Sequence, residues 1–178
     1  MKFAFLRDPR FPFYLALAAG VGLTGCAVLL AAMMRLSACP LCIIQRMLYL
    51  SISTFALLGL SAGNRRGARV IVLLLMSLAA ATGVFVAGFQ VWLQRFARFA
   101  SCAADYPWWE QLVDWAGERL PLLFHASGSC GDPAWIFLGL SIAEWSLVIF
   151  FSLLVFFSRT LFKSLSHRQE RTSRGGAM

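Results

Sequence analysis

Two cysteines with a spacing typical of redox and metal sites stand out in an otherwise apolar chain. Cys39 and Cys42 lie in the segment ACPLCIIQR. Zinc needs about four Cys, His or carboxylate ligands, but His167 is expected across the membrane from the pair and His125 in a separate loop. Covalent haem attachment needs a histidine directly after the second cysteine, where this chain has Ile43. The pattern therefore favours redox use of the pair, with a purely structural disulfide as the alternative.

The residues around the pair favour a reactive thiolate. Pro40 suits the start of a helix, because its missing N–H is one of the donors that would lack a partner there, and this places Cys42 in the first turn. The unpaired amides and the dipole at a helix N-terminus stabilise a thiolate. Arg46 follows Cys42 by four residues and lies on the same helix face. Arg46 either anchors the helix at the membrane surface or holds the thiolate and an anionic or carbonyl-bearing acceptor.

The elements that carry these residues are expected to cross a membrane. The chain has 178 residues, of which 60% are hydrophobic and 13% charged, and about 20 apolar residues span a hydrocarbon core. We expect an all-α membrane protein, a bundle of four transmembrane helices in a single domain. The expected spans are residues 11–34, 42–62, 70–94 and 145–162. The last span is the least regular, because Arg159 must reach the surface for the helix to extend past it.

The net charge of +8 reports orientation rather than nucleic-acid binding. Most of the 16 basic residues flank the apolar runs, at Lys2, Arg7, Arg10, Arg65, Arg66, Arg69, Arg159, Lys163, Arg168, Arg171 and Arg174. Basic residues are retained on the cytoplasmic side. Both termini are therefore expected in the cytoplasm, and two loops, residues 35–41 and 95–144, on the outer side.

The long outer loop contains a segment with an amphipathic pattern. Trp108, Leu112 and Trp115 recur at helical spacing, and tryptophan prefers the headgroup level of a bilayer. We expect a short interfacial helix with this face on the membrane surface and with acidic residues, among them Glu110, on the other side. The alternative is that the three apolar residues pack against the protein's own helix ends.

The remaining cysteines suggest a second redox pair. The topology places Cys39, Cys42, Cys102 and Cys130 outside, in a compartment that is usually oxidising. Four cysteines allow three pairings; the short gap favours Cys39 with Cys42, which leaves Cys102 and Cys130. Cys26 lies within the first span, where a thiol usually behaves as a small hydrophobe. The alternative for Cys26 is a lipoprotein processing site, because it follows Leu-Thr-Gly behind a basic, apolar leader.

These motifs resemble a known family. Cys-x-x-Cys-x-x-x-Arg stands at the outer start of the second of four spans, and a further cysteine pair occupies the long outer loop. The stretches ASGSC at 126–130 and WIFLGL at 135–140 fit as well. The combination is similar to disulfide bond formation protein B (DsbB), the bacterial inner-membrane thiol:quinone oxidoreductase family, and the likeness covers nearly the whole chain.

The resemblance implies a mechanism for these residues. Cys102 would receive attack from a soluble periplasmic DsbA-like thiol oxidase, and Cys130 would be its disulfide partner. Electrons would pass to Cys39 and Cys42 and then to a membrane quinone, ubiquinone or menaquinone, near the outer end of the second span. Cys42 would face the quinone, with Arg46 steering and polarising it.

Two positions depart from the family pattern. Gln45 stands where an acidic residue is common, and Gln90 stands where some members carry histidine near the quinone. Gln90 is therefore a candidate quinone-binding residue with a different hydrogen-bonding character. His125 is expected to be a surface residue of the loop rather than a proton carrier.

Two other functions use the same cysteines differently. A conduit carrying reducing equivalents outward would need a thiol or cofactor on the cytoplasmic side, and no cysteine is expected there. A four-helix scaffold or transporter subunit would use the cysteines only as structural disulfides. In that case quinone would not change the thiol state.

Overall fold

The computed structural model describes residues 10–62, 65–96, 108–131, 133 and 135–175. The four long helices are α1 (Phe11–Met34), α2 (Pro40–Ser61), α3 (Arg66–Phe96) and α6 (Ile142–Gly175). The shorter elements are the helices α4 (Trp108–Arg119) and α5 (Pro121–Phe124) and the strands β1 (Ile136–Phe137) and β2 (Leu140–Ser141).

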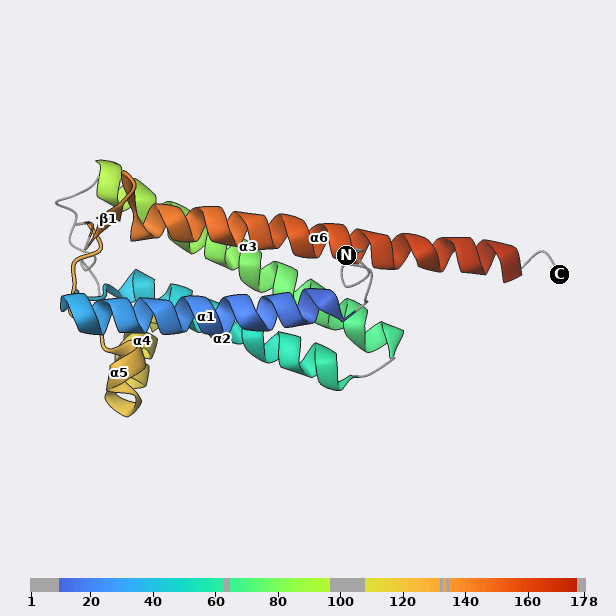
Figure 1. Cartoon of the computed structure of the whole chain (residues 1–178), viewed down its shortest axis with the longest axis horizontal. Helices are drawn as coiled ribbons and strands as arrows, with labels where there is room; N and C mark the ends of the chain where they lie inside the picture. Colours follow the sequence, from blue (N-terminus) through green and yellow to red (C-terminus); the bar gives the residue numbers. More distant parts are fainter. Residues whose placement is uncertain (1–9, 63–64, 97–107, 132, 134, 176–178) are drawn as a thin grey trace, which may run out of the picture.

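The four long helices run side by side along the long axis of the molecule, and α6 extends beyond the others toward the C-terminus (Figure 1). Each is long and apolar enough to cross a membrane, α6 over Ile142–Ser166. The expectation of an all-α protein with four spans is therefore confirmed. The two short strands form one antiparallel hairpin, with Ile136 opposite Ser141 and Phe137 opposite Leu140.

Close helix packing depends on two glycines. A Cβ at Gly20 of α1 would lie 2.1 Å from Ser53 Oγ and 2.5 Å from the carbonyl oxygen of Tyr49 on α2. A Cβ at Gly83 of α3 would lie 2.3 Å from the ring of Phe150 on α6. The absence of a side chain at both positions lets each helix approach its neighbour, and the Phe150 ring stacks on Tyr49 in the buried core.

The shorter elements gather at one end of the bundle, where α2 begins (Figure 1). We call this end, which holds Cys39, the cysteine end. Helix α2 begins at Pro40, and Cys39 is its N-cap, with the sulfur accepting a hydrogen bond from Cys42 N. The helix therefore starts two residues earlier than the expected span.

Helix α4 packs with the face opposite to Trp108 and Trp115. Val113, Ala116 and Gly117 are buried, and a Cβ at Gly117 would lie 3.0 Å from the carbonyl oxygen of Phe124 in α5. Glu110 lies on this face, on the side away from Trp108 and Trp115 as the sequence predicts, and is also buried. The reason is the helical period, which puts Glu110 one turn from Val113.

The expected apolar face of α4 is exposed. Trp108 is 76% exposed, Leu112 48% and Trp115 54%. Among the described residues these side chains are not covered by the protein's own helix ends, so the structure does not support that alternative.

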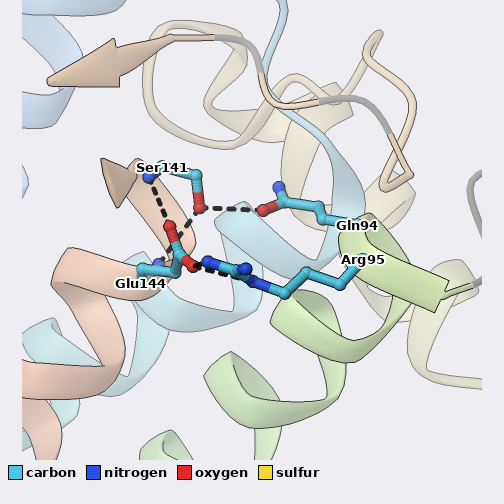
Figure 2. A network of polar contacts seen from close by, with 4 residues as sticks. All are labelled: Gln94, Arg95, Ser141 and Glu144. Carbon is cyan, nitrogen blue, oxygen red and sulfur yellow. Dashed lines mark hydrogen bonds and ion pairs between the residues drawn. The ribbon is translucent and has the colours of Figure 1, made fainter. Parts of the chain in front are cut away.

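A polar network ties α3 to α6 at the cysteine end (Figure 2). Ser141 and Glu144 form a capping box at the start of α6: the carboxylate accepts from Ser141 N at 2.7 Å, and Ser141 Oγ accepts from Glu144 N at 3.3 Å. Glu144 also pairs with Arg95, and Ser141 Oγ donates to Gln94 Oε1 at 2.8 Å. The hairpin that precedes α6 is thereby held against the end of α3.

Candidate functional site

The two cysteines at the start of α2 form a dithiol. Cys39 Sγ donates to Cys42 Sγ at 2.9 Å, whereas a disulfide bond is about 2.05 Å long. Cys39 is buried and Cys42 is partly buried. The N-cap geometry brings both sulfurs to the first turn, where Cys42 N donates to Cys39 Sγ at 3.3 Å.

Two glutamine side chains connect the sulfurs to α3. Gln90 Nε2 donates to Cys39 Sγ at 3.2 Å and to Cys42 Sγ at 3.1 Å. Gln45 Nε2 donates to Gln90 Oε1 at 2.6 Å. Both glutamines are buried. The sequence suggested Gln90 as a quinone ligand; its amide contacts the two sulfurs, and a quinone contact stays a prediction.

Cys130 lies beside Cys39. Cys130 is fully buried and forms a cluster with Cys39, Leu41 and Leu93, against which Trp109 of α4 packs. Hydrogen bonds with Cys130 and Cys42, together with burial, raise the pKa of the Cys39 thiol. Cys39 therefore stays protonated at neutral pH and is a donor toward Cys42.

Backbone contacts bring Cys130 to this place. The amides of Ser127 and Gly128 both donate to the carbonyl oxygen of Ala38, at 2.9 and 3.0 Å. The segment just before Cys130 is thus docked on the segment just before Cys39. This contact joins two loops that are far apart in the sequence.

Arg46 contributes to the same region. Its guanidinium Nη1 donates to the carbonyl oxygen of Leu123 in α5 at 3.0 Å, and its side chain lines the same cavity as Cys42. The arginine therefore connects the long loop to the wall of the cavity. Its action on a thiolate or an acceptor stays a prediction.

A cavity of about 540 Å³ opens beside Cys42 between α1, α2, the hairpin and α6. Its walls are mostly apolar and include Trp135 and Trp145. The polar residues among its lining are Thr24, Ser37, Cys42, Gln45, Arg46, Tyr49 and Ser146. Thr24 is buried, and its hydroxyl has no hydrogen-bond partner in the part of the chain that the structure describes. The cavity thus has polar groups near the Cys42 thiol and apolar walls elsewhere.

The other candidates from the sequence have different outcomes. Cys102 lies outside the described residues. Cys26 is exposed on α1 and also lines the cavity. His125 is exposed at the end of α5. Sequence reasoning missed Trp109 and Thr24, since an aromatic residue beside Trp108 and a threonine within an apolar helix carry no specific signal by themselves.

The fold and the site together define a class: an integral membrane oxidoreductase with a buried dithiol at one end of a four-helix bundle. The family model described as disulfide bond formation protein DsbB matches residues 9–159. The chain therefore belongs to the DsbB family, whose role is disulfide bond formation.

Curated relatives agree with this assignment. Disulfide bond formation protein B of Dechloromonas aromatica is 40% identical over 141 residues, which cover 75% of this chain and 81% of the relative. Disulfide bond formation protein B 1 of Pseudomonas aeruginosa is 34% identical over 152 residues, covering 84% of this chain and 92% of the relative. The similarity thus extends over most of both chains.

Proposed function

We propose that this protein reoxidises a soluble DsbA-like dithiol oxidase and passes the electrons through two cysteine pairs to a membrane quinone. The observation that carries the proposal is the order Cys130, Cys39, Cys42 and cavity, each next to the following one. A thiol exchange route and an acceptor site therefore meet at Cys42.

The thiol chemistry balances in two exchange steps. A thiolate of the partner attacks Cys102 in a Cys102–Cys130 disulfide, and the partner's second thiol resolves the mixed disulfide. The partner leaves oxidised by two electrons, and Cys102 and Cys130 become thiols. Cys130 then attacks Cys39 of a Cys39–Cys42 disulfide and releases Cys42 as a thiolate. Attack of Cys102 on Cys130 restores the first disulfide and releases Cys39 as a thiol.

The residues at the cavity then complete the cycle. A bound quinone supplies an acceptor for two electrons and two protons. The Cys42 thiolate would give up an electron pair while Cys39 loses its proton and closes the disulfide, so that a thiolate and a thiol become one disulfide. The second proton is the one that Cys130 released when it attacked Cys39. Arg46 holds the thiolate and the acceptor together at the polar end of the cavity. Its guanidinium N–H groups can donate hydrogen bonds both to a thiolate sulfur and to a carbonyl oxygen of the acceptor.

The cavity fits this acceptor. A quinone has carbonyl oxygens on a flat ring and an apolar tail, which match polar groups near Cys42 and apolar walls beyond them. Within the described residues the hydroxyl of Thr24 is a buried donor without a partner, and such a group costs free energy unless a ligand or water satisfies it. Thr24 is therefore suited to a quinone oxygen.

We place the protein in the bacterial inner membrane with both termini in the cytoplasm and the cysteine end in the periplasm. Basic residues just before and at the start of α3, and on the distal part of α6, support this orientation, since Lys and Arg are retained inside. The exposed face of Trp108, Leu112 and Trp115 then lies at the periplasmic membrane surface.

One experiment tests the proposal against a purely structural role for the cysteines. The purified protein is reduced, a soluble quinone is added, and quinone absorbance is followed together with thiol alkylation. We expect one quinone to be reduced for every two thiols lost at Cys39 and Cys42, and no quinone reduction in the Cys42→Ser variant. Thiols that survive the addition of quinone would refute the oxidase function and favour the scaffold alternative.

A further inference from the structure

The hydrogen bonds of the Gln90 side-chain amide fix which of its two ends faces the sulfurs. Its carbonyl oxygen is occupied by Gln45 Nε2 at 2.6 Å, so its amino group is the part that faces the sulfurs of Cys39 and Cys42. Both glutamines are buried on α2 and α3, and a buried amide that lost these partners would cost free energy. The pair therefore holds one orientation.

The donors around the two sulfurs are unequal. Cys42 Sγ accepts from the Cys39 thiol at 2.9 Å and from Gln90 Nε2 at 3.1 Å. Cys39 keeps its proton, and its sulfur accepts from Cys42 N and Gln90 Nε2. Cys42 is thus the sulfur at which negative charge is best stabilised, and it is the one on the cavity wall.

We infer that Gln90 is a catalytic residue that stabilises the Cys42 thiolate by a direct hydrogen bond, and that Gln45 is a positioning residue that fixes the Gln90 amide in its donating orientation. The inference deepens the proposed function and rests on it, because the Cys42 thiolate is the electron donor only in that mechanism. It assigns Gln90 to the sulfur rather than to the quinone. The stabilisation needs no ionisable partner, since neither amide titrates.

The chain offers a matched control on the same helix. Gln94 lies one turn beyond Gln90 on α3, is buried as well, and accepts from Ser141 Oγ at 2.8 Å, whereas Gln90 donates to the sulfurs of Cys39 and Cys42. Gln94→Met and Gln90→Met remove the same polar group from neighbouring turns of one helix. A difference between them reports on the sulfur contact rather than on packing.

The test measures Cys42 in the reduced full-length protein without quinone or partner. Alkylation by iodoacetamide at neutral pH is followed by peptide mass mapping, and the thiolate is measured independently by its ultraviolet absorbance against Cys42→Ser. A hydrogen bond to a charged group changes the thiolate population by about 10-fold or more, and the higher nucleophilicity of the more basic thiolate offsets part of this. We expect Cys42 alkylation to fall roughly 3- to 10-fold in Gln90→Met.

Three further variants sharpen the result. Gln90→Glu keeps the size but replaces the donor by an acceptor, so the thiolate absorbance should fall at least as far as in Gln90→Met. Gln45→Met should give a smaller fall, because the Gln90 amide remains but can rotate. Gln94→Met should leave both readouts at wild-type values.

The outcomes separate this inference from the proposed function. Wild-type alkylation and absorbance in Gln90→Met and Gln90→Glu, or an equal loss in Gln94→Met, would overturn the role of Gln90. A wild-type protein that fails to reduce quinone would refute the proposed function, yet a fall confined to the Gln45 and Gln90 variants would still establish the thiolate contact.

Discussion

Gly128 lies so close to Ser37 that a Cβ at position 128 would fall 2.5 Å from the carbonyl oxygen of Ser37. The two residues belong to different loops, and this close approach is what docks the Cys130 segment on the Cys39 segment. A glycine is needed here for space, because the facing atom is backbone and cannot rotate away.

We predict that Gly128→Ala slows electron transfer between the two cysteine pairs. The added methyl group must displace the loop, and such overpacking costs about 1–3 kcal/mol, which lowers the docked population about 5- to 150-fold. Rapid-quench alkylation after mixing with a reduced partner would show delayed reduction of Cys39 and Cys42. Gly67→Ala is the control, since a Cβ there meets nothing within 4 Å. Equal delays in the two variants would contradict the docking role.

The Arg46→Ala variant should slow reduction of added quinone by roughly 10- to 150-fold, the effect of losing a hydrogen bond to a charged group. Arg46→Lys should lie between this variant and wild type, because the charge remains but the planar fork that also reaches Leu123 O is lost. Stopped-flow quinone absorbance measures both. Wild-type quinone kinetics in Arg46→Ala would show that the arginine serves only as a membrane anchor.

Thr24→Val should weaken quinone binding. The substitution keeps the shape of the side chain and removes a hydroxyl that has no partner among the described residues, so we expect the Kd to rise about 2- to 10-fold, as for one neutral hydrogen bond. Quenching of Trp135 and Trp145 fluorescence by quinone measures the Kd, because both residues line the cavity.

Thr54→Val provides the comparison for that experiment. Thr54 is exposed on α2, and its hydroxyl donates to the Leu50 carbonyl oxygen at 2.9 Å. Its removal should leave the Kd unchanged. A Kd that shifts equally in both variants, or in neither, would rule out Thr24 as a quinone donor.

Electrons should enter at Cys102. Exchange passes through a mixed disulfide that needs a resolving thiol, so Cys130→Ser combined with a partner lacking its own resolving cysteine should accumulate a covalent complex. Cys102→Ser should accumulate none. Non-reducing gels with mass mapping would read the linkage, and a complex joined through Cys130 or Cys39 would reverse the assigned order.

Both termini and residues 63–68 should lie in the cytoplasm. The basic residues that flank the apolar runs motivate this orientation. Fusions of a reporter that is active only in the periplasm, placed at Gly67 and at the C-terminal tail, should be inactive, and a fusion in the 95–144 loop should be active. An active reporter at Gly67 would contradict this orientation, because the cysteines would then face the cytoplasm rather than the oxidising compartment.

The sequence by itself determined the four spans, the dithiol and the family. Apolar runs long enough to cross a bilayer are a local property, and the four helices appear where such runs occur. The position of Pro40 between two cysteines likewise predicts a helix start, because capping depends on neighbouring residues alone. The motif order then identified the family that the comparisons confirm.

The tertiary structure decided which groups meet. Gln90 and Cys42 lie on different helices, Cys130 and Cys39 in different loops, and the buried face of α4 depends on α5 rather than on its own amphipathic pattern. Contacts between distant segments arise from the packing of all the helices together. Thr24 therefore gives no local signal, and Gln90 stood out only through the family resemblance, which did not predict its contact with the sulfurs. The sequence therefore predicts the dithiol, whereas only the packed bundle places an amide against its sulfurs and a cavity beside it.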